Sequence, residues 1–208
     1  MDEKPPQFLE WAREIQALAQ TGLHYARDDY ERDRCRRLME IAAEMISRMG
    51  GVNYLPLLNA FDAQIGYATP KIDVRAAVFQ NDKLLLVREK MDGEWTMPGG
   101  WADVGDTPSK AAEREAWEEA GFHVQATRVV GVYDANRTNP LEVFHAFKIV
   151  FLCHILDGAA RPSLETSEVA FFDEEKMPAV FSRGRTTTRQ VNDAFVASRN
   201  PGSLTVFD

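Results

Sequence analysis

The fold is decided by GGWADVGDTPSKAAEREAWEEAGF, the stretch at residues 99–122. Its second half predicts a helix from about Pro108 to Ala120. Thr107 is a good N-cap residue, and proline fits the first helical position because its missing N–H would have no partner there. Gly121 follows the last helical residue, where a left-handed C-cap belongs. Both ends of the helix are therefore marked in the sequence.

The predicted helix carries three glutamates on one face, because Glu118 and Glu119 follow Glu115 at i+3 and i+4. Each like-charged pair at this spacing should destabilise an isolated helix by roughly 0.2–0.5 kcal/mol. Arg114 can pair with Glu118 at i+4, which compensates only one of the three charges. A divalent cation would compensate the rest, and hard oxygen ligands without His or Cys favour Mg²⁺ or Mn²⁺ over zinc. The alternative is a polar helix face with ordinary solvent-facing glutamates.

These residues resemble the Nudix box. The box of the Nudix hydrolases is a Gly, five residues, a Glu, seven residues, Arg-Glu, an aliphatic residue, any residue, Glu-Glu, any residue, a Gly and an apolar residue. The matching positions are Gly100, Arg114-Glu115, Glu118-Glu119 and Gly121-Phe122. Two positions depart, since Asp106 stands where the first Glu is expected and Ala116 is a minimal aliphatic residue. The shorter Asp106 leaves open the contact that this Glu would make.

The resemblance implies an α+β fold class, a Nudix-type α/β/α sandwich with a mixed sheet, and a metal-dependent hydrolase. It implies that Mg²⁺ or Mn²⁺ is held by Glu115, Glu118 and Glu119, with the Gly100 carbonyl as a further ligand. Arg114 would orient a glutamate rather than touch the substrate. Family members often supply the general base from a loop before a late strand, so Glu165 and Glu168 are candidates beside Glu119. The expected catalytic residues are Arg114, Glu115, Glu118, Glu119 and Glu168.

Nearly all of the remaining chain resembles one subgroup of the family, which carries an N-terminal helical domain. The similar stretches are Ala19–Leu23, Gly66–Arg75, Glu165–Val169 and Phe171-Phe172. The subgroup is associated with hydrolysis of a nucleoside diphosphate linked to another group, of the CDP-choline or ADP-ribose type, to give a nucleoside monophosphate and a phosphorylated partner. Its members are similar in being dimers. The resemblance therefore implies a homodimeric pyrophosphohydrolase, with the nucleoside and the linked group left open.

Two amphipathic helices are predicted before the Nudix-like region. Apolar residues recur at helical spacing from Pro6 to Gln20, and Gly22 lies where a left-handed C-cap belongs. The second helix begins after Asp28 as N-cap and stops at Gly50-Gly51. A hairpin of two helices cannot bury both faces by itself, so its remaining apolar surface must meet the rest of the chain or a second copy. We expect three parts: a helical hairpin domain at 1–51, a connector at 52–70 and a Nudix domain at 71–208.

From Lys71 onward the pattern predicts strands. Apolar residues alternate with others from Ile72 to Phe79, and Asn81-Asp82 offers a two-residue hairpin turn into Lys83–Val87. Further strands are predicted at Thr127–Tyr133, Phe144–Leu156 and Val169–Phe172. Helices are predicted around Leu55–Phe61 and at Thr187–Ser198. Strands with one central and one terminal helix imply a layered α+β domain.

Candidates for contact with the substrate lie outside the box. Arginines that could hold a phosphate or sugar are Arg75, Arg137, Arg183, Arg185 and Arg189. Aromatic residues that could stack on a base are Trp101, Tyr133 and Phe144, although aromatic residues at strand spacing are usually core. For each arginine the alternative is an ordinary solvent-exposed side chain. The predicted substrate-binding residues are Arg75, Trp101 and Tyr133.

Composition narrows the classes of partner. The chain has 208 residues, of which 45% are hydrophobic, enough for one sizeable domain and a smaller one. Its net charge of −8 argues against a nucleic-acid or anionic-membrane surface, so cations must mediate the binding of a phosphate ester.

The absence of a signal core or a membrane-length apolar run predicts a cytoplasmic location. Cys35 and Cys153 lie far apart, which predicts reduced buried thiols.

An enzyme and a sensor are the two functional alternatives. A ligand-sensing module built on this fold would be expected to lose ligand glutamates and to carry a basic DNA-reading helix. Here the box glutamates are intact, and residues 1–51 hold ten acidic against eight basic residues. The sequence therefore favours a hydrolase.

Overall fold

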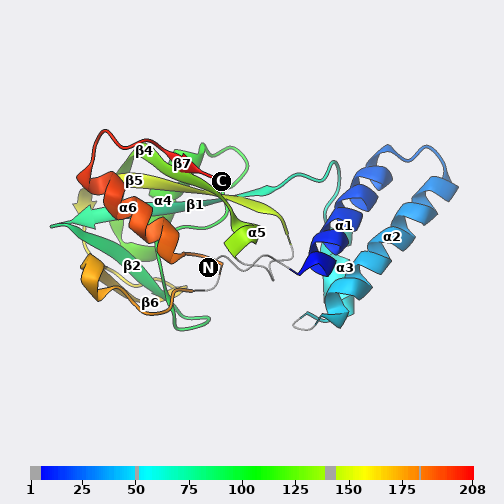
Figure 1. Ribbon diagram of the computed structural model, residues 1–208, viewed down its shortest axis with the longest axis horizontal. Helices are drawn as coiled ribbons and strands as arrows, with labels where there is room; N and C mark the ends of the chain where they lie inside the picture. Colours follow the sequence, from blue (N-terminus) through cyan, green and yellow to red (C-terminus); the bar gives the residue numbers. More distant parts are fainter. Residues whose placement is uncertain (1–5, 50–51, 139–143, 183) are drawn as a thin grey trace. The chain divides into compact units, whose positions relative to one another are not determined.

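The structure is a computed structural model that describes residues 6–49, 52–138, 144–182 and 184–208 (Figure 1). The chain divides into two compact units. The first takes in residues 1–70 with 136–145, and the second takes in 71–135 with 146–208. The predictions for Gly50-Gly51 and Arg183 lie outside the described residues. Among the described helices, none combines the length and the apolar content that a bilayer-spanning segment needs.

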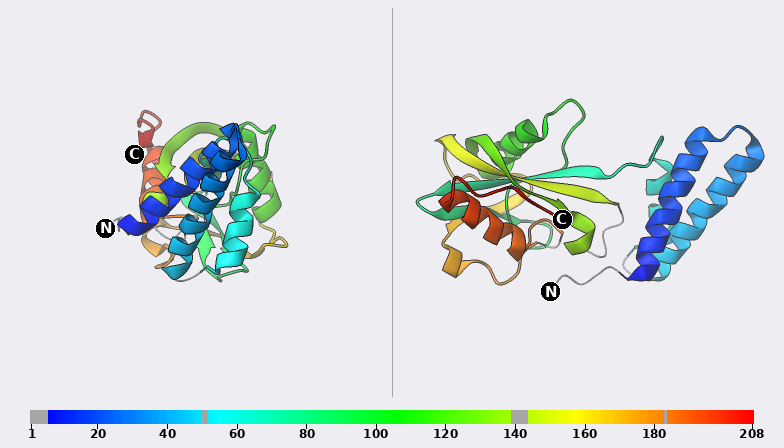
Figure 2. Two further views of the ribbon diagram at one scale, coloured as in Figure 1. Left: turned by 90° about the vertical axis from the view of Figure 1, so that its right-hand side faces the viewer. Right: turned by 45° about the horizontal axis from the view of Figure 1, so that its top comes forward.

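Three helices form most of the first unit: α1 (Gln7–Tyr25), α2 (Asp29–Arg48) and α3 (Tyr54–Asp62). α1 and α2 lie side by side in Figures 1 and 2, and α3 packs against α2. Asp28 is the N-cap of α2 as predicted, since its side chain accepts a hydrogen bond from the Glu31 amide at 2.7 Å. The core of this unit consists of Leu9, Ala12, Ala19, Met39, Ala42, Ala43, Ile46, Leu57 and Phe61.

The C-cap expected at Gly22 is wrong, because α1 continues through this residue to Tyr25. The reason is packing between the helices. A Cβ built on Gly22 would lie 2.5 Å from the Sγ atom of Cys35 on α2, far inside van der Waals contact. Glycine therefore serves the close approach of α1 to α2 and does not end the helix.

The second unit is built on a mixed seven-stranded sheet. Its strands are β1 (Lys71–Gln80), β2 (Lys83–Glu89), β3 (Trp95–Thr96), β4 (Phe122–Asp134), β5 (Ala146–Gly158), β6 (Thr166–Phe172) and β7 (Val206–Phe207). They are ordered β3-β2-β1-β5-β4-β7, with β6 paired to β2. β1 pairs in parallel with β5, as β4 does with β7, and the other pairs are antiparallel. Asn81 and Asp82 both have positive φ, as the predicted hairpin turn requires.

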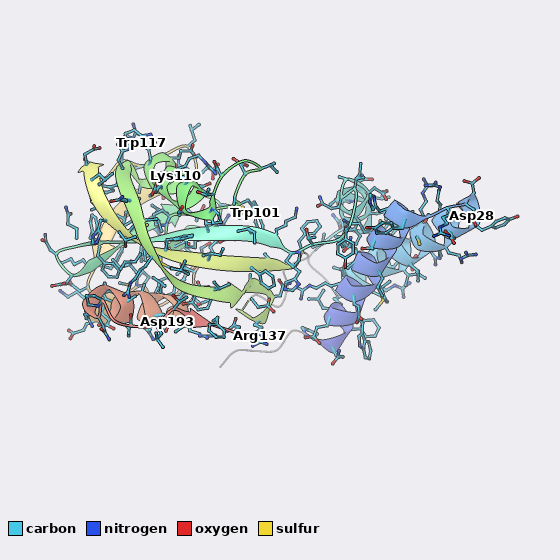
Figure 3. The ribbon with its side chains drawn as sticks, turned by 90° about the horizontal axis from the view of Figure 1, so that it is seen from above. Asp28, Trp101, Lys110, Trp117, Arg137 and Asp193 are labelled. Carbon is cyan, nitrogen blue, oxygen red and sulfur yellow. The ribbon has the colours of Figure 1, made fainter. Side chains whose placement is uncertain are left out.

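Helices cover both faces of this sheet, which confirms the predicted α/β/α sandwich. α4 (Pro108–Ala120) packs on one face and α6 (Thr188–Arg199) on the other, as Figure 3 shows from above. Along β1, Val74 and Ala76 face the layer of α4, whereas Ala77 faces the layer of α6. Two further elements are α5 (Ala135–Thr138) and the 3₁₀ helix η1 (Glu174–Lys176).

Gly22→Ala should lower the stability of the helical unit, although alanine favours a helix over glycine by about 0.5–1 kcal/mol. The new Cβ collides with the sulfur of Cys35. Overpacking of this kind typically costs about 1–3 kcal/mol. Adding Cys35→Ala removes the sulfur, so the double variant should regain stability in thermal unfolding. A single Gly22→Ala variant that is more stable than the wild type would contradict the close approach.

Candidate active site

The helix that carries the box begins and ends where the sequence predicts. Thr107 Oγ1 accepts a hydrogen bond from the Lys110 amide, and Gly121 is left-handed with a φ of 78°. A Cβ on Gly121 would also lie 2.6 Å from the carbonyl oxygen of Ala159, so space as well as conformation requires glycine there. Figure 3 shows Lys110 and Trp117 on α4, across the sheet from α6. These ends fix the place of the three glutamates against the sheet.

The three box glutamates lie at different depths. Glu119 is 5% exposed, and its Oε2 accepts a hydrogen bond from the Gly99 amide at 2.9 Å. Glu115 lies against Gly100, since a Cβ on that glycine would be 3.2 Å from Glu115 Oε1. Glu118 is exposed. The helix thus presents a carboxylate row, Glu115, Glu118 and Glu119, that runs from the interior of the unit to solvent.

Arg114 compensates two members of the carboxylate row. Its Nη1 donates to Glu115 Oε1 at 2.8 Å and to Glu118 Oε2 at 3.1 Å, the second contact being the predicted i, i+4 pair. The same guanidinium lies 3.3 Å from Asp106 Oδ2 and 3.4 Å from Asp103 Oδ2. Asp106, which replaces the first glutamate of the box, therefore reaches Arg114 despite its shorter stem. Arg114 in this way ties the loop before α4 to the carboxylate row.

A glycine-containing segment runs beside β1 and faces the carboxylate row. The carbonyls of Pro98 and Gly100 accept hydrogen bonds from the amides of Ala76 and Val74, both at 2.8 Å. Gly99 has a φ of 150°, and a Cβ there would lie 2.0 Å from the Val74 carbonyl oxygen, so only glycine fits. The Gly100 carbonyl oxygen has a second lone pair that could bind a metal ion.

Burial makes Glu119 a weak acid. Loss of solvent raises the pKa of Glu119 to about 7, and the charges of Glu115 and Glu89 act in the same direction. The Gly99 amide and the positive charge of Arg75 oppose this rise. Burial also raises the pKa of Glu115, against the effect of Arg114. The ionised forms of Glu115 and Glu119 are therefore costly unless a further positive charge is close.

The donor set fits a hard divalent cation. All three members of the row are carboxylates, and the Oε1 atom of Glu119 makes no hydrogen bond with the described residues. Within the described ranges, no three acidic, imidazole or thiol side chains converge closely enough to hold an ion. The contacts give the reason, because Glu115 and Glu118 direct oxygens at Arg114 while Glu119 directs one at Gly99. The second oxygen of each of these carboxylates makes no hydrogen bond with the described residues and would be available to a cation.

The predicted substrate-binding residues are not brought together. Arg75 is 2% exposed and forms a two-point ion pair with Asp73. Tyr133 is buried in the α6 layer, where its hydroxyl donates to Asp193 Oδ2 at 2.9 Å. Trp101 lies beside β1, is 47% exposed and follows directly after Gly100. Of these three side chains, Trp101 is the one that presents a surface to solvent.

Glu165 and Glu168, the two candidates for the general base outside α4, lie in different surroundings: Glu165 precedes β6, whereas Glu168 lies within it. Glu168, on β6, accepts a hydrogen bond from Arg88 at 2.7 Å. Both side chains of this pair are partly exposed. Glu165 precedes β6. Burial raises the pKa of Glu89, and the charge of Glu165 adds to this rise. Glu89 in turn acts on Glu119.

The other predicted contact residues have different surroundings within their own units. Arg185 Nε is 3.2 Å from Glu89 Oε1, whereas Arg189 pairs with the Asp208 side chain. Arg137 is exposed on α5 (Figure 3). Phe144 packs against Phe61 in the first unit, with ring centroids 6.2 Å apart.

Three buried charged residues near the box were not singled out from the sequence: Asp73, Glu89 and Lys148. Lys148 Nζ lies 3.4 Å from Asp73 Oδ1, and burial lowers the pKa of Lys148 to about 8. The sequence alone could have pointed to these three residues. Each charge stands within or at the end of a strand rich in apolar residues, where charged side chains are rare unless they are paired.

The layered fold, the capped helix with its carboxylate row and the glycine segment that faces it define a Nudix-type hydrolase. Residues 69–194 match the NUDIX domain. Residues 6–61 match the family described as "UDP-X-like, N-terminal oligomerisation domain". The chain belongs to the Nudix family.

Relatives and solved structures agree with this assignment. The chain is 36% identical over 202 residues to a Bacillus subtilis protein named "Putative ADP-ribose pyrophosphatase YjhB", covering 97% of each chain. A crystal structure of an ADP-ribose pyrophosphatase from Streptococcus suis matches with 41% identity and a TM-score of 0.61, over 67% of this chain and all (100%) of that one. A crystal structure of a UDP-X diphosphatase matches with 28% identity and a TM-score of 0.62, over 96% and 97% of the two chains. The protein is accordingly a Nudix pyrophosphohydrolase.

In metal-free buffer, Glu119→Gln should stabilise the protein at alkaline pH. The pKa of Glu119 is about 7 in the folded chain, against an ordinary value of 4.5, so the folded state binds this proton more tightly than the unfolded state. Stability should therefore fall as pH rises from about 5 to about 8. Glutamine stays neutral, so its advantage should be small at about pH 5 and reach at most about 3 kcal/mol at about pH 8.

Denaturant unfolding in the presence of a chelator at both pH values measures this difference. An equal loss of stability in Glu119→Gln at both pH values would contradict the buried, weakly acidic carboxyl group.

Proposed function

We propose that the protein hydrolyses the pyrophosphate bond of a nucleoside diphosphate linked to another group, in a reaction that requires Mg²⁺ or Mn²⁺. The observation that carries the proposal is the carboxylate row, whose innermost member, Glu119, is held by the Gly99 amide. The products would be a nucleoside monophosphate and a phosphorylated partner.

The residues of the site have distinct roles in this proposal. Glu115, Glu118 and Glu119 would hold the cation together with the Gly100 carbonyl. A bound divalent cation would neutralise phosphate oxygens and lower the pKa of a water molecule. Arg114 orients Glu115 and Glu118 through its Nη1. Gly99 allows the close approach of its segment to β1, and Gly100 lies against the Glu115 carboxylate.

The general base is proposed from three carboxylates. Glu119 is close to the cation by its role as a ligand. Glu165 directly precedes β6 and is exposed, and its carboxylate makes no hydrogen bond or ion pair with the described residues. Glu168 is engaged by Arg88 at 2.7 Å. The ion pair of Glu168 with Arg88 favours Glu165 over Glu168 as the base that is not itself a metal ligand.

ADP-ribose is the proposed substrate, with CDP-choline as the second candidate. The names of the Bacillus subtilis and Streptococcus suis proteins support ADP-ribose. Trp101 is the proposed stacking surface for the base, since it is half exposed and directly follows Gly100. Aromatic stacking tolerates adenine and cytosine alike, so other contacts must choose between them.

With Mg²⁺ present, the protein should convert ADP-ribose into AMP and ribose 5-phosphate faster than it cleaves CDP-choline, diadenosine polyphosphates or nucleoside triphosphates. Glu119→Gln should lower kcat by about 10²–10⁴-fold, because it removes a metal ligand and a candidate base. Glu113→Gln is the matched control on the same helix, since Glu113 contacts Lys110 and the Ala126 amide outside the carboxylate row. Chromatography of the nucleotide products measures both variants.

Each alternative outcome has a distinct meaning. Full activity in Glu119→Gln would refute the ligand assignment. Cleavage of triphosphates alone would refute the substrate class. Binding of ADP-ribose without hydrolysis would favour the ligand-sensing alternative.

We also propose that the protein is a homodimer formed through its helical unit. Large apolar side chains lie exposed along one face of α1, at positions spaced by three or seven residues: Phe8, Trp11, Leu18 and Tyr25. The inward residues Leu9, Ala12 and Ala19 already fill the core of the unit, so this second apolar face is left for a partner. The family description of residues 6–61 as an oligomerisation domain supports the proposal.

The double variant Trp11→Glu/Leu18→Glu should be monomeric, because two buried carboxylates would be desolvated in the interface. Light scattering coupled to gel filtration measures the molar mass. Tyr30→Glu is the control, since Tyr30 is a large exposed residue at the start of α2 and lies outside the face of Phe8 and Trp11. A double variant with the molar mass of the wild type would place the interface elsewhere.

A further inference from the structure

We infer that Arg75 is a positioning residue, which sets the place of Glu119 by holding the backbone of residues 96–99 and does not bind the substrate. The inference rests on the proposed function, in which Glu119 holds the cation. It gives Arg75 a different role from the substrate contact predicted from the sequence.

Arg75 is fixed by buried partners at each of its nitrogens. Its Nε and Nη2 donate to the two carboxylate oxygens of Asp73, at 3.0 and 2.9 Å. Its Nη1 donates to the Met97 carbonyl at 3.2 Å and lies 3.5 Å from Thr96 Oγ1. With the residue 2% exposed, a phosphate could reach it only by breaking a buried ion pair, which is strongly unfavourable.

The segment that Arg75 holds leads directly to Glu119. Arg75 binds the carbonyl of Met97, and the Gly99 amide donates to Glu119 Oε2 at 2.9 Å. Only Pro98 lies between these residues, and its ring fixes φ near about −65°. A shift at Met97 is therefore passed on to Gly99 because the chain between them has little freedom to absorb it.

The stem of Arg75 also packs against Gly99 itself. A Cβ on Gly99 would lie 2.9 Å from Arg75 Cδ and 2.0 Å from the Val74 carbonyl oxygen. Gly99 is thus confined on the side of β1 by Arg75 and Val74, while its amide faces Glu119. This confinement sets the direction of the Gly99 N–H group, which donates its hydrogen bond to the Glu119 carboxylate.

Thr186 holds the same segment from the loop before α6. Its Oγ1 accepts a hydrogen bond from the Met97 amide at 3.0 Å and lies 2.9 Å from Thr96 Oγ1. Met97 is therefore held at its carbonyl by Arg75 and at its amide by Thr186. The two anchors come from different elements, so each can be removed separately.

The test measures Mn²⁺ binding by electron paramagnetic resonance, together with kcat and KM for ADP-ribose. Arg75→Lys keeps the charge but loses the planar fork that serves Asp73 and Met97 together. Thr186→Val keeps the volume but loses the acceptor for the Met97 amide. Both variants should weaken Mn²⁺ binding by about 10–100-fold and lower kcat, while KM at saturating metal changes less than about threefold.

Two matched controls separate positioning from general loss of stability. Arg128→Lys makes the same chemical change at another guanidinium. Arg128 donates to the carbonyls of Asn200 and Ser203 at 3.0 and 3.1 Å, and its contacts with the described residues do not include residues 96–99. Thr186→Ser keeps the hydroxyl group. Both controls should bind Mn²⁺ within about twofold of the wild type, even where Arg128→Lys lowers the melting temperature. If Arg75→Lys does not fold, Thr186→Val against Thr186→Ser decides the question.

Normal Mn²⁺ affinity with a raised KM in Arg75→Lys would overturn the inference in favour of a substrate contact. Equal weakening in Arg128→Lys, or equal affinities in Thr186→Val and Thr186→Ser, would overturn it as well. A wild-type protein that neither binds Mn²⁺ nor cleaves a diphosphate would defeat the proposed function itself. That failure is distinguishable because it is seen before any variant is made.

Discussion

The hydrogen bond from the Gly99 amide to Glu119 joins the two halves of the site. Glu119 comes from the helical layer and Gly99 from the segment beside β1, so this contact sets the carboxylate row against the sheet. It requires glycine, because a side chain at residue 99 would collide with the Val74 carbonyl. It also requires a fixed last turn of α4. Gly121 provides that turn through its left-handed conformation, and the Thr166 hydroxyl adds a tether by donating to the Glu119 carbonyl at 2.8 Å.

The interior beside this contact holds paired charges where a simpler domain would hold apolar side chains. Asp73 serves two cations, accepting both hydrogen bonds of the Arg75 fork and lying 3.4 Å from Lys148. Its attraction does not offset the burial of Lys148 and the repulsion from Arg75, so the pKa of Lys148 falls to about 8. Such a network contributes little net stability compared with a well-packed apolar core. The network instead fixes the positions of its members. Each charged side chain has few alternative partners, so the backbone that it holds is also fixed.

The sequence alone predicted features that depend on residues close together in the chain, such as the two ends of α4 and the turn at Asn81-Asp82. It failed where the role of a residue depends on contact with a residue far away in the sequence. Gly22 has the local character of a C-cap, but contact with Cys35 determines its role. Arg75 was predicted to contact the substrate or to be exposed, whereas Asp73 and Arg75 are buried with partners from β5 and from the segment before the box. β3 and β7 have two residues each, too few for any periodicity to reveal.

The pairing of these charges also explains why a diphosphate would need a cation to bind here. Arg75 shares Asp73 with Lys148, while Arg114 is paired with two members of the carboxylate row and Arg185 with Glu89. A phosphate group next to the row would therefore meet net negative charge. At an effective dielectric constant of about 20, two unit charges about 4 Å apart interact by about 4 kcal/mol, so the direct contact would be repulsive. A divalent cation placed between the carboxylate row and the phosphate would attract both of them, so two attractive interactions would replace the repulsion. Arg114 engages one oxygen each of Glu115 and Glu118, so the second oxygen of each carboxylate would be left for the cation.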